Sequence, residues 1–143
     1  MRCAFCELPE IQNRKIADNG LAWAFPTNIP IVPGHTLIAP VRCVAKFEEL
    51  KPEEQKSIFE LATQIKKALT TAFDAEGFNI AWNEGKLAGQ SVPHFHLHIL
   101  PRKVGDGGIT EYEPRQFLYR PGSREASLES ELQEVARLIK EKF

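Results

Sequence analysis

Three of the four histidines in the chain alternate with apolar residues in the segment SVPHFHLHILPR, residues 91–102. Pro93 and Pro101 enclose the alternating run, and proline is poorly tolerated inside both helices and central strands. A helix would distribute alternate positions around its circumference, whereas a strand directs all of them to one face. We therefore predict a strand over residues 94–100, with the rings of His94, His96 and His98 on one side. Phe95, Leu97 and Ile99 would be buried on the other side.

A row of imidazoles on one strand face can do chemistry, because alternate residues lie only about 7 Å apart. Histidine titrates near neutrality, so such a row can combine a nucleophile, a proton donor and an orienting group. Two other interpretations stay open at this point. One is a polar sheet face that happens to contain histidine, and the other is a metal site formed by the row alone, although no carboxylate lies on the predicted strand.

The remaining sequence predicts an α+β fold with a mainly antiparallel sheet of about five strands. Residues 20–25, 36–39 and 78–82 are short apolar runs typical of strands. Apolar residues at spacings of three and four over 51–73 predict one main amphipathic helix, which would cover a sheet face. A second helical pattern extends from about 125 to 141, and residues 117–119 are a candidate edge strand.

Length and composition place the chain among ordinary globular proteins. With 143 residues we predict a single domain over 1–143. No apolar run is long enough to span a membrane, and a net charge of −1 provides no global positive field for nucleic acid, so we expect neither partner. Three cysteines fit reduced thiols or a metal site better than a disulfide framework, which predicts a cytoplasmic location.

The histidine segment resembles the motif of the histidine triad family, in which three histidines alternate with apolar residues and a further apolar residue follows. The resemblance extends to NEG and AGQSV at residues 83–85 and 88–92, to PGHTLI at 33–38, and to CAFC at 3–6. Together these matches span about residues 3–103. The segments IPIVPGH and LPRKVGD are most similar to the fragile-histidine-triad branch of the family.

The resemblance implies an enzyme that hydrolyses a nucleotide at its α-phosphorus through a covalent nucleotidyl-histidine. His96 would be the nucleophile, because a neutral imidazole attacks phosphorus without prior deprotonation, and His98 would assist the leaving oxygen. A related transferase branch has glutamine at the position of His98, so hydrolysis is favoured over transfer. The expected substrate is a dinucleoside polyphosphate. A nucleoside phosphoramidase, a regulatory nucleotide-binding module with incidental turnover, and a metal-carrying protein are the alternatives.

The resemblance also implies a set of nucleotide-binding residues. A glycine-flanked loop exposes backbone N–H groups to an anion, which supports a phosphate-binding role for NEGKLAGQS independently of the family. The loop is not a Walker loop, because Lys86 is not followed by Ser or Thr. Many relatives have Asp or Asn at the place of Thr27, beside Asn28, to contact the ribose. The predicted substrate-binding residues are His35, Asn83, Gly89, Gln90, Ser91, Val92 and Asn28.

Cys3 and Cys6 form a C-x-x-C pair, which by itself also fits reduced core thiols or a redox pair. Some family members bind structural zinc through such a pair, a histidine after the second strand, and the first triad histidine. Aligning TLIAPVRC places Cys43 where that downstream histidine would be. The resemblance therefore implies a zinc site of Cys3, Cys6, Cys43 and His94.

His94 thus has two predicted roles, as a metal ligand that holds the strand and as a member of the catalytic triad. Mg²⁺ bound with the substrate phosphates is left open. Small members of the family commonly pair, so we also expect a homodimer.

Overall fold

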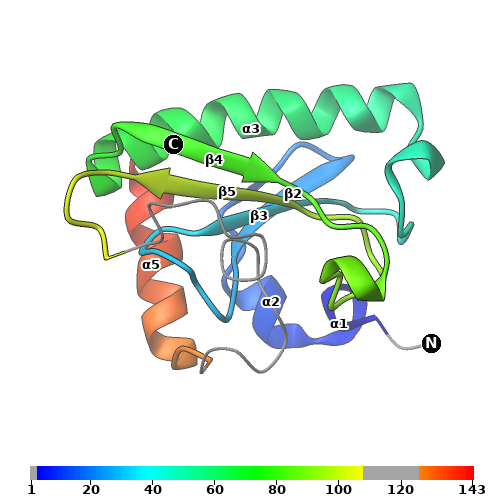
Figure 1. Cartoon of the computed structure of the whole chain (residues 1–143), viewed down its shortest axis with the longest axis horizontal. Helices are drawn as coiled ribbons and strands as arrows, with labels where there is room; N and C mark the ends of the chain where they lie inside the picture. The colour runs from blue at the N-terminus through cyan, green and yellow to red at the C-terminus, as the bar shows by residue number, and fades with distance from the viewer. Residues whose placement is uncertain (1–2, 108–125) are drawn as a thin grey trace.

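An antiparallel sheet of five strands, in the order β1-β2-β3-β5-β4, forms the frame of the fold (Figure 1). The structure, a computed structural model, describes residues 3–107 and 126–143. The candidate edge strand at 117–119 lies outside the described residues. The strands are β1 (Ala17–Asp18), β2 (Ala22–Pro26), β3 (Thr36–Pro40), β4 (Gly77–Ala81) and β5 (Leu97–Arg102). The predicted α+β class is therefore confirmed.

The helices lie on both sides of this sheet. They are α1 (Ala4–Glu7), α2 (Pro9–Asn13), α3 (Pro52–Phe73) and α5 (Glu129–Glu141), with short 3₁₀ helices η1 (Phe47–Glu49) and η2 (Lys86–Ala88). The long helix α3 covers one face, and α1 and α2 lie on the other (Figure 1). Figure 1 also shows α5 extending from the α3 side past the end of the strands. None of the helices that the structure describes is long and apolar enough to cross a membrane.

The main helix α3 occupies the segment that the apolar spacing predicts. Its buried stripe includes Ile58, Leu61, Ile65 and Leu69, which pack in one core with apolar residues of β2, β3 and β5. Pro52 stands in the first turn, where its missing N–H costs no hydrogen bond. Asp74, with a left-handed φ of 54°, ends the helix.

The histidine strand begins later than predicted. β5 starts at Leu97 rather than at His94, because the preceding backbone bonds elsewhere: Phe95 N–H donates to the Val44 carbonyl at 2.6 Å. The strand also continues through Pro101 to Arg102. The Arg102 carbonyl accepts from Glu76 N–H, so the backbone groups of Arg102 point toward β4. Those of the preceding residue, Pro101, point the other way, toward β3. The pairing of β5 with β3 has already ended at Ile99. A proline is tolerated there because no partner needs its N–H.

Three other elements have boundaries that differ from the predictions. The C-terminal helix α5 starts at Glu129, not near residue 125, because Ser127 N–H donates to the Asn28 carbonyl at 2.8 Å and Leu128 is extended. β2 starts at Ala22 instead of residue 20, because the Asn19 side chain accepts from Ala22 N–H at 2.9 Å and closes a turn. β4 is shifted by one residue toward the N-terminus from the predicted 78–82.

Gly34 brings the fourth histidine close to the triad. Its φ is +89°, and a Cβ at this position would lie 3.0 Å from Pro101 Cγ and 3.2 Å from the Phe73 ring. Both the backbone conformation and the lack of space therefore require glycine. The chain can thus enter β3 at His35 in close contact with β5 and α3.

Candidate functional site

All four histidines of the chain gather on the sheet face opposite α3. Leu37 of β3 pairs with His98 of β5, so His35, two residues before Leu37, lies beside His98. The ring centroids of His35 and His98 are 5.2 Å apart, and those of His96 and His98 are 5.0 Å apart. Phe95, Leu97 and Ile99 lie in the core on the α3 side, as the alternation predicts. The histidine face is therefore a compact buried cluster.

The orientation of the His96 ring is set by a backbone carbonyl. His96 Nδ1 lies 2.8 Å from the His94 carbonyl oxygen. A carbonyl can only accept, so Nδ1 carries the proton and Nε2 keeps its lone pair. Burial lowers the pKa of His96 to about 4, against the hydrogen bond to His94, which raises it. The ring is thus neutral and offers Nε2 as a nucleophile.

His35 and His98 form a second pair whose tautomers follow from their partners. Ile31 N–H donates to His35 Nδ1 at 3.1 Å, so the proton of the neutral His35 ring lies on Nε2. His35 Nε2 is 2.9 Å from His98 Nδ1 and donates to it. His98 therefore carries its own proton on Nε2. The pair therefore presents a hydrogen-bond donor, His98 Nε2–H, next to the His96 ring, where it can stabilise a developing negative charge.

The predicted phosphate loop lies between β4 and the histidine segment. Asn83 Nδ2 donates to the Gly89 carbonyl at 3.4 Å, and the Gln90 side chain connects Gly85 N–H with the Ala45 carbonyl, both at 2.9 Å. The N–H groups of Gly89 and Gln90 bond to carbonyls within the loop. Gln90 therefore braces the loop, while Ser91 is exposed and Val92 is half-buried. Phosphate binding by these residues stays a prediction.

Cys3, Cys6, Cys43 and His94 come together at the N-terminal end of the histidine segment. Their sulfur and ring nitrogen atoms all lie within 4.8 Å of one another. His94 Nδ1 is 3.3 Å from Cys3 Sγ and 3.6 Å from Cys6 Sγ. Nitrogen and sulfur ligands of a tetrahedral zinc ion are about 3.6 Å apart, as bond lengths of about 2.0 and 2.3 Å require. The residues thus fit a metal ion.

The chemistry of these four groups also suits a metal. His94 Nε2 donates to the Pro40 carbonyl at 2.7 Å, which leaves Nδ1 unprotonated and directed at the sulfurs. Burial lowers the pKa of His94 and keeps its ring neutral. Burial, together with the adjacent Cys3 and Cys43 sulfurs, raises the pKa of Cys6 to about 12. Thiolates this close together need a cation to stabilise them.

Phe5 lies between the cysteine cluster and His96. Its ring meets the His96 ring edge to face at 5.0 Å and also contacts the rings of His94 and Phe25. Sequence reasoning missed this residue, although its place inside the C-x-x-C pair was a signal. It also missed the backbone groups of Pro40 and Ile31, which no side-chain pattern reveals.

A cleft of about 450 Å³ opens beside this cluster. Phe5, Phe25, Leu37 and Ile11 give it apolar walls, and the predicted ribose neighbours Thr27 and Asn28 line it as well. Its volume lies within the usual range for small-molecule sites. None of the four histidines lines this cleft, but two of its lining residues are adjacent to them: Phe5 contacts the His96 ring, and Leu37 pairs with His98.

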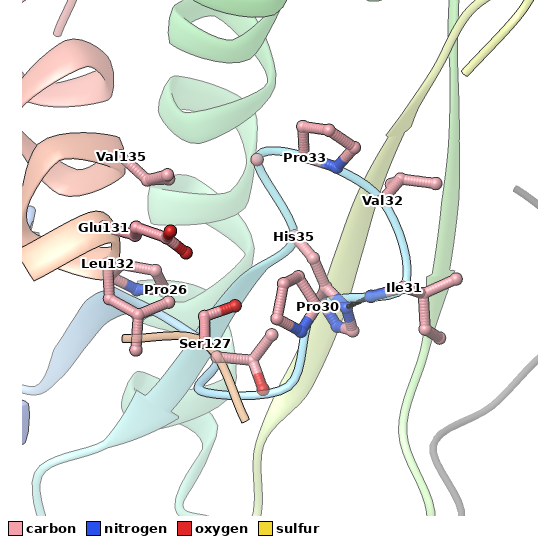
Figure 2. A pocket seen from close by; sticks show the side chains of 12 residues that line it. Pro26, Pro30, Ile31, Val32, Pro33, His35, Ser127, Glu131, Leu132 and Val135 are labelled. Carbon is pink, nitrogen blue, oxygen red and sulfur yellow. Dashed lines mark hydrogen bonds between the residues drawn. The ribbon is translucent and has the colours of Figure 1, made fainter. Parts of the chain in front are cut away.

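A second cavity lies behind His35. Figure 2 shows it between the proline-rich loop that carries Pro30, Ile31 and Pro33 and the side chains of Glu131 and Leu132 on α5. It shares Thr27 and Ser127 with the first cleft. Neither His96 nor His98 lines it.

A comparison with protein families matches a HIT domain over residues 8–105. The chain belongs to the HIT family. An asymmetrical bis(5′-nucleosyl)-tetraphosphatase of Schizosaccharomyces pombe is 40% identical over 86 residues, which are 60% of this chain and 47% of that protein. The chain therefore corresponds to only about half the length of that relative.

Two further HIT proteins cover more of the chain. An adenosine 5′-monophosphoramidase of Schizosaccharomyces pombe is 33% identical over 111 residues, 76% of this chain and 80% of that protein. A solved structure of a Zn-bound histidine triad protein from Mycobacterium smegmatis superposes with a TM-score of 0.73 at 26% identity, covering 99% of this chain and 93% of the other. The HIT fold is thus shared over nearly the whole chain.

Proposed function

We propose that this protein is a HIT nucleotide hydrolase that cleaves a dinucleoside polyphosphate at its α-phosphorus through a nucleotidyl-His96 intermediate. The observation that carries the proposal is the His96 tautomer, with Nδ1–H bound to the His94 carbonyl and the Nε2 lone pair left for attack. The similarity to a named bis(5′-nucleosyl)-tetraphosphatase supports the substrate class.

The two chemical steps follow from the two histidine pairs. In the first step, His96 Nε2 forms a bond to the α-phosphorus as the bond to the bridging oxygen breaks, and the Nε2–H of His98 donates a hydrogen bond to that oxygen, which leaves as a phosphate anion. In the second step, water attacks the same phosphorus, the P–N bond breaks to release the nucleotide and neutral His96, and the proton lost by the water passes to the solvent. His98 keeps its proton in both steps, because its loss from a neutral ring would leave an imidazolate.

The nucleoside part of the substrate fits the cleft beside Phe5. The apolar walls suit a planar base, and Thr27 and Asn28 are within the same cleft for the ribose. The phosphates would then lie over the triad, next to Ser91 and the loop that Gln90 braces.

A nucleoside phosphoramidase is the second candidate, favoured by the similarity to the adenosine 5′-monophosphoramidase. It uses the same nucleophile, and only the leaving group differs: an amine rather than a phosphate oxygen. A regulatory role for nucleotide binding would instead make turnover incidental.

We expect His96→Asn to reduce hydrolysis of both diadenosine polyphosphates and adenosine phosphoramidates at least about 10³-fold, because the attacking nitrogen is lost. Asparagine can still donate to the His94 carbonyl, so the fold and nucleotide binding should be retained. The measurement is kcat/KM on both substrate classes with wild type and variant, together with AMP affinity. The wild type should favour the diadenosine polyphosphates. Turnover by the variant within tenfold of wild type would refute the covalent mechanism.

We further propose that the Cys3, Cys6, Cys43 and His94 cluster holds a structural zinc ion. The closed set of three sulfurs and one nitrogen, and the Pro40 carbonyl behind His94, support this assignment. The zinc would fix the His94 side chain and, through it, the carbonyl that orients His96. A cytoplasmic location is part of this proposal, since these thiols must stay reduced.

Metal analysis of the purified protein tests the zinc proposal. Wild type should contain about one zinc per chain, and Cys43→Ala should lose most of it because three ligands bind far more weakly than four. Ser91→Ala, which leaves the cluster intact, is the control and should keep the zinc. Substoichiometric zinc in fresh wild-type protein, or full zinc in Cys43→Ala, would show that the cluster is not a zinc site.

We also propose that two copies of the chain pair along β4. This strand is at the edge of the described sheet, and Ile80 and Trp82 remain 44% and 37% exposed there. An open edge with exposed apolar residues is a typical site for strand addition. Sedimentation equilibrium should therefore give a dimer for wild type and a monomer for Ile80→Lys. A monomeric wild type at micromolar concentration would exclude this interface.

A further inference from the structure

A buried arginine lies at the wall of the cleft beside Phe5. Arg14 is only 5% exposed, and its Nε donates to the Pro26 carbonyl at 3.1 Å. Its Nη1 donates to Glu129 Oε2 at 2.8 Å, across 115 positions of the sequence. These two bonds hold the guanidinium in one place and connect the end of α2 to the start of α5.

Glu129 has a second oxygen that this ion pair does not use. Glu129 Oε1 is buried and accepts no hydrogen bond from the residues that the structure describes. A buried carboxylate oxygen without a donor is costly, because it has given up its contacts with water. Glu129 and Arg14 both line the cleft beside Phe5, together with Thr27 and Asn28.

The start of α5 is also attached to this cleft by the backbone. Ser127 N–H donates to the Asn28 carbonyl at 2.8 Å, so residues 127–129 form part of the cleft wall rather than a free connection. The carboxylate is therefore positioned by three elements: the ion pair with Arg14, the bond at Asn28, and the helix that follows.

We propose that Glu129 is a specificity-determining residue whose Oε1 accepts a hydrogen bond from the nucleoside bound in this cleft. This inference rests on the proposed nucleotide hydrolase function. The partner must be a donor of the nucleoside, because a carboxylate at neutral pH only accepts. A nucleoside offers two kinds of donor at the depth of the cleft, the ribose hydroxyls and an exocyclic amino group of the base. Arg14 occupies the other carboxylate oxygen, so Oε1 is the one left to accept from a ligand.

Glu129→Gln is the sharpest test, because it changes one atom and preserves the shape. The amide oxygen of the glutamine can still accept from Arg14 at the position of Oε2. The NH₂ group then occupies the position of Oε1. The position facing the nucleoside thereby changes from an acceptor to a donor. Glu131→Gln is the matched control, since it removes the same charge from the same helix, and Figure 2 places Glu131 at the other cavity.

The probes are AMP, 2′-deoxy-AMP, 3′-deoxy-AMP and purine riboside monophosphate, which lacks the amino group, with dissociation constants measured by calorimetry. We expect Glu129→Gln to weaken AMP binding about 10- to 100-fold, as loss of a hydrogen bond to a charged group does. Glu131→Gln should bind like wild type. For the one analogue that lacks the contacted donor, wild type and Glu129→Gln should bind equally well. That analogue shows whether Glu129 contacts a ribose hydroxyl or the amino group of the base.

Three outcomes would overturn the inference. Unchanged AMP affinity in Glu129→Gln would show that Oε1 does not face the ligand. Equal weakening for AMP and all three analogues would show that Glu129 only maintains the cleft wall through Arg14. If wild type binds none of the four nucleotides, the proposed function fails together with the inference, whereas in the first two cases the proposed function stands.

Discussion

The hydrogen bond from His96 Nδ1 to the His94 carbonyl, at 2.8 Å, is the interaction on which the rest of the site depends. A free neutral imidazole exchanges between two tautomers, and only the one with the proton on Nδ1 presents a lone pair at Nε2. The carbonyl selects that tautomer and points the lone pair away from the backbone. Its own position depends on His94, whose ring is held between the Pro40 carbonyl and the cysteine sulfurs.

The two faces of the sheet have different roles in positioning the histidines: one forms the main apolar core and the other carries the four rings. The α3 face has the larger apolar core, in which Phe95, Leu97 and Ile99 anchor the histidine segment. The opposite face buries all four histidines, and the rings of His94 and His96 contact Phe5 there. Gly34 supplies the close approach that brings His35, 63 positions earlier in the chain, within hydrogen-bond distance of His98.

Much of this fold and site can be predicted from local patterns in the sequence. Alternation located the histidine face, the spacing of apolar residues located α3, and the family resemblance brought Cys43 to a cluster that the structure then assembles. Element ends were less predictable, because tertiary bonds decide them: Val44 takes the Phe95 N–H, and Asn28 delays the start of α5. The pairing of Arg14 with Glu129 could not be read from the sequence either, since nothing local connects residues 115 positions apart.

The most direct test is the protonation pattern of the His96 ring, measured by ¹⁵N-edited NMR of protein labelled at histidine. We expect a neutral ring near pH 7 with the proton on Nδ1 and a bare Nε2, assigned by comparison with His96→Asn. A His96 ring with its proton on Nε2, or a charged ring with protons on both nitrogens, would contradict it. Either result would mean that Nε2 cannot be the atom that attacks phosphorus.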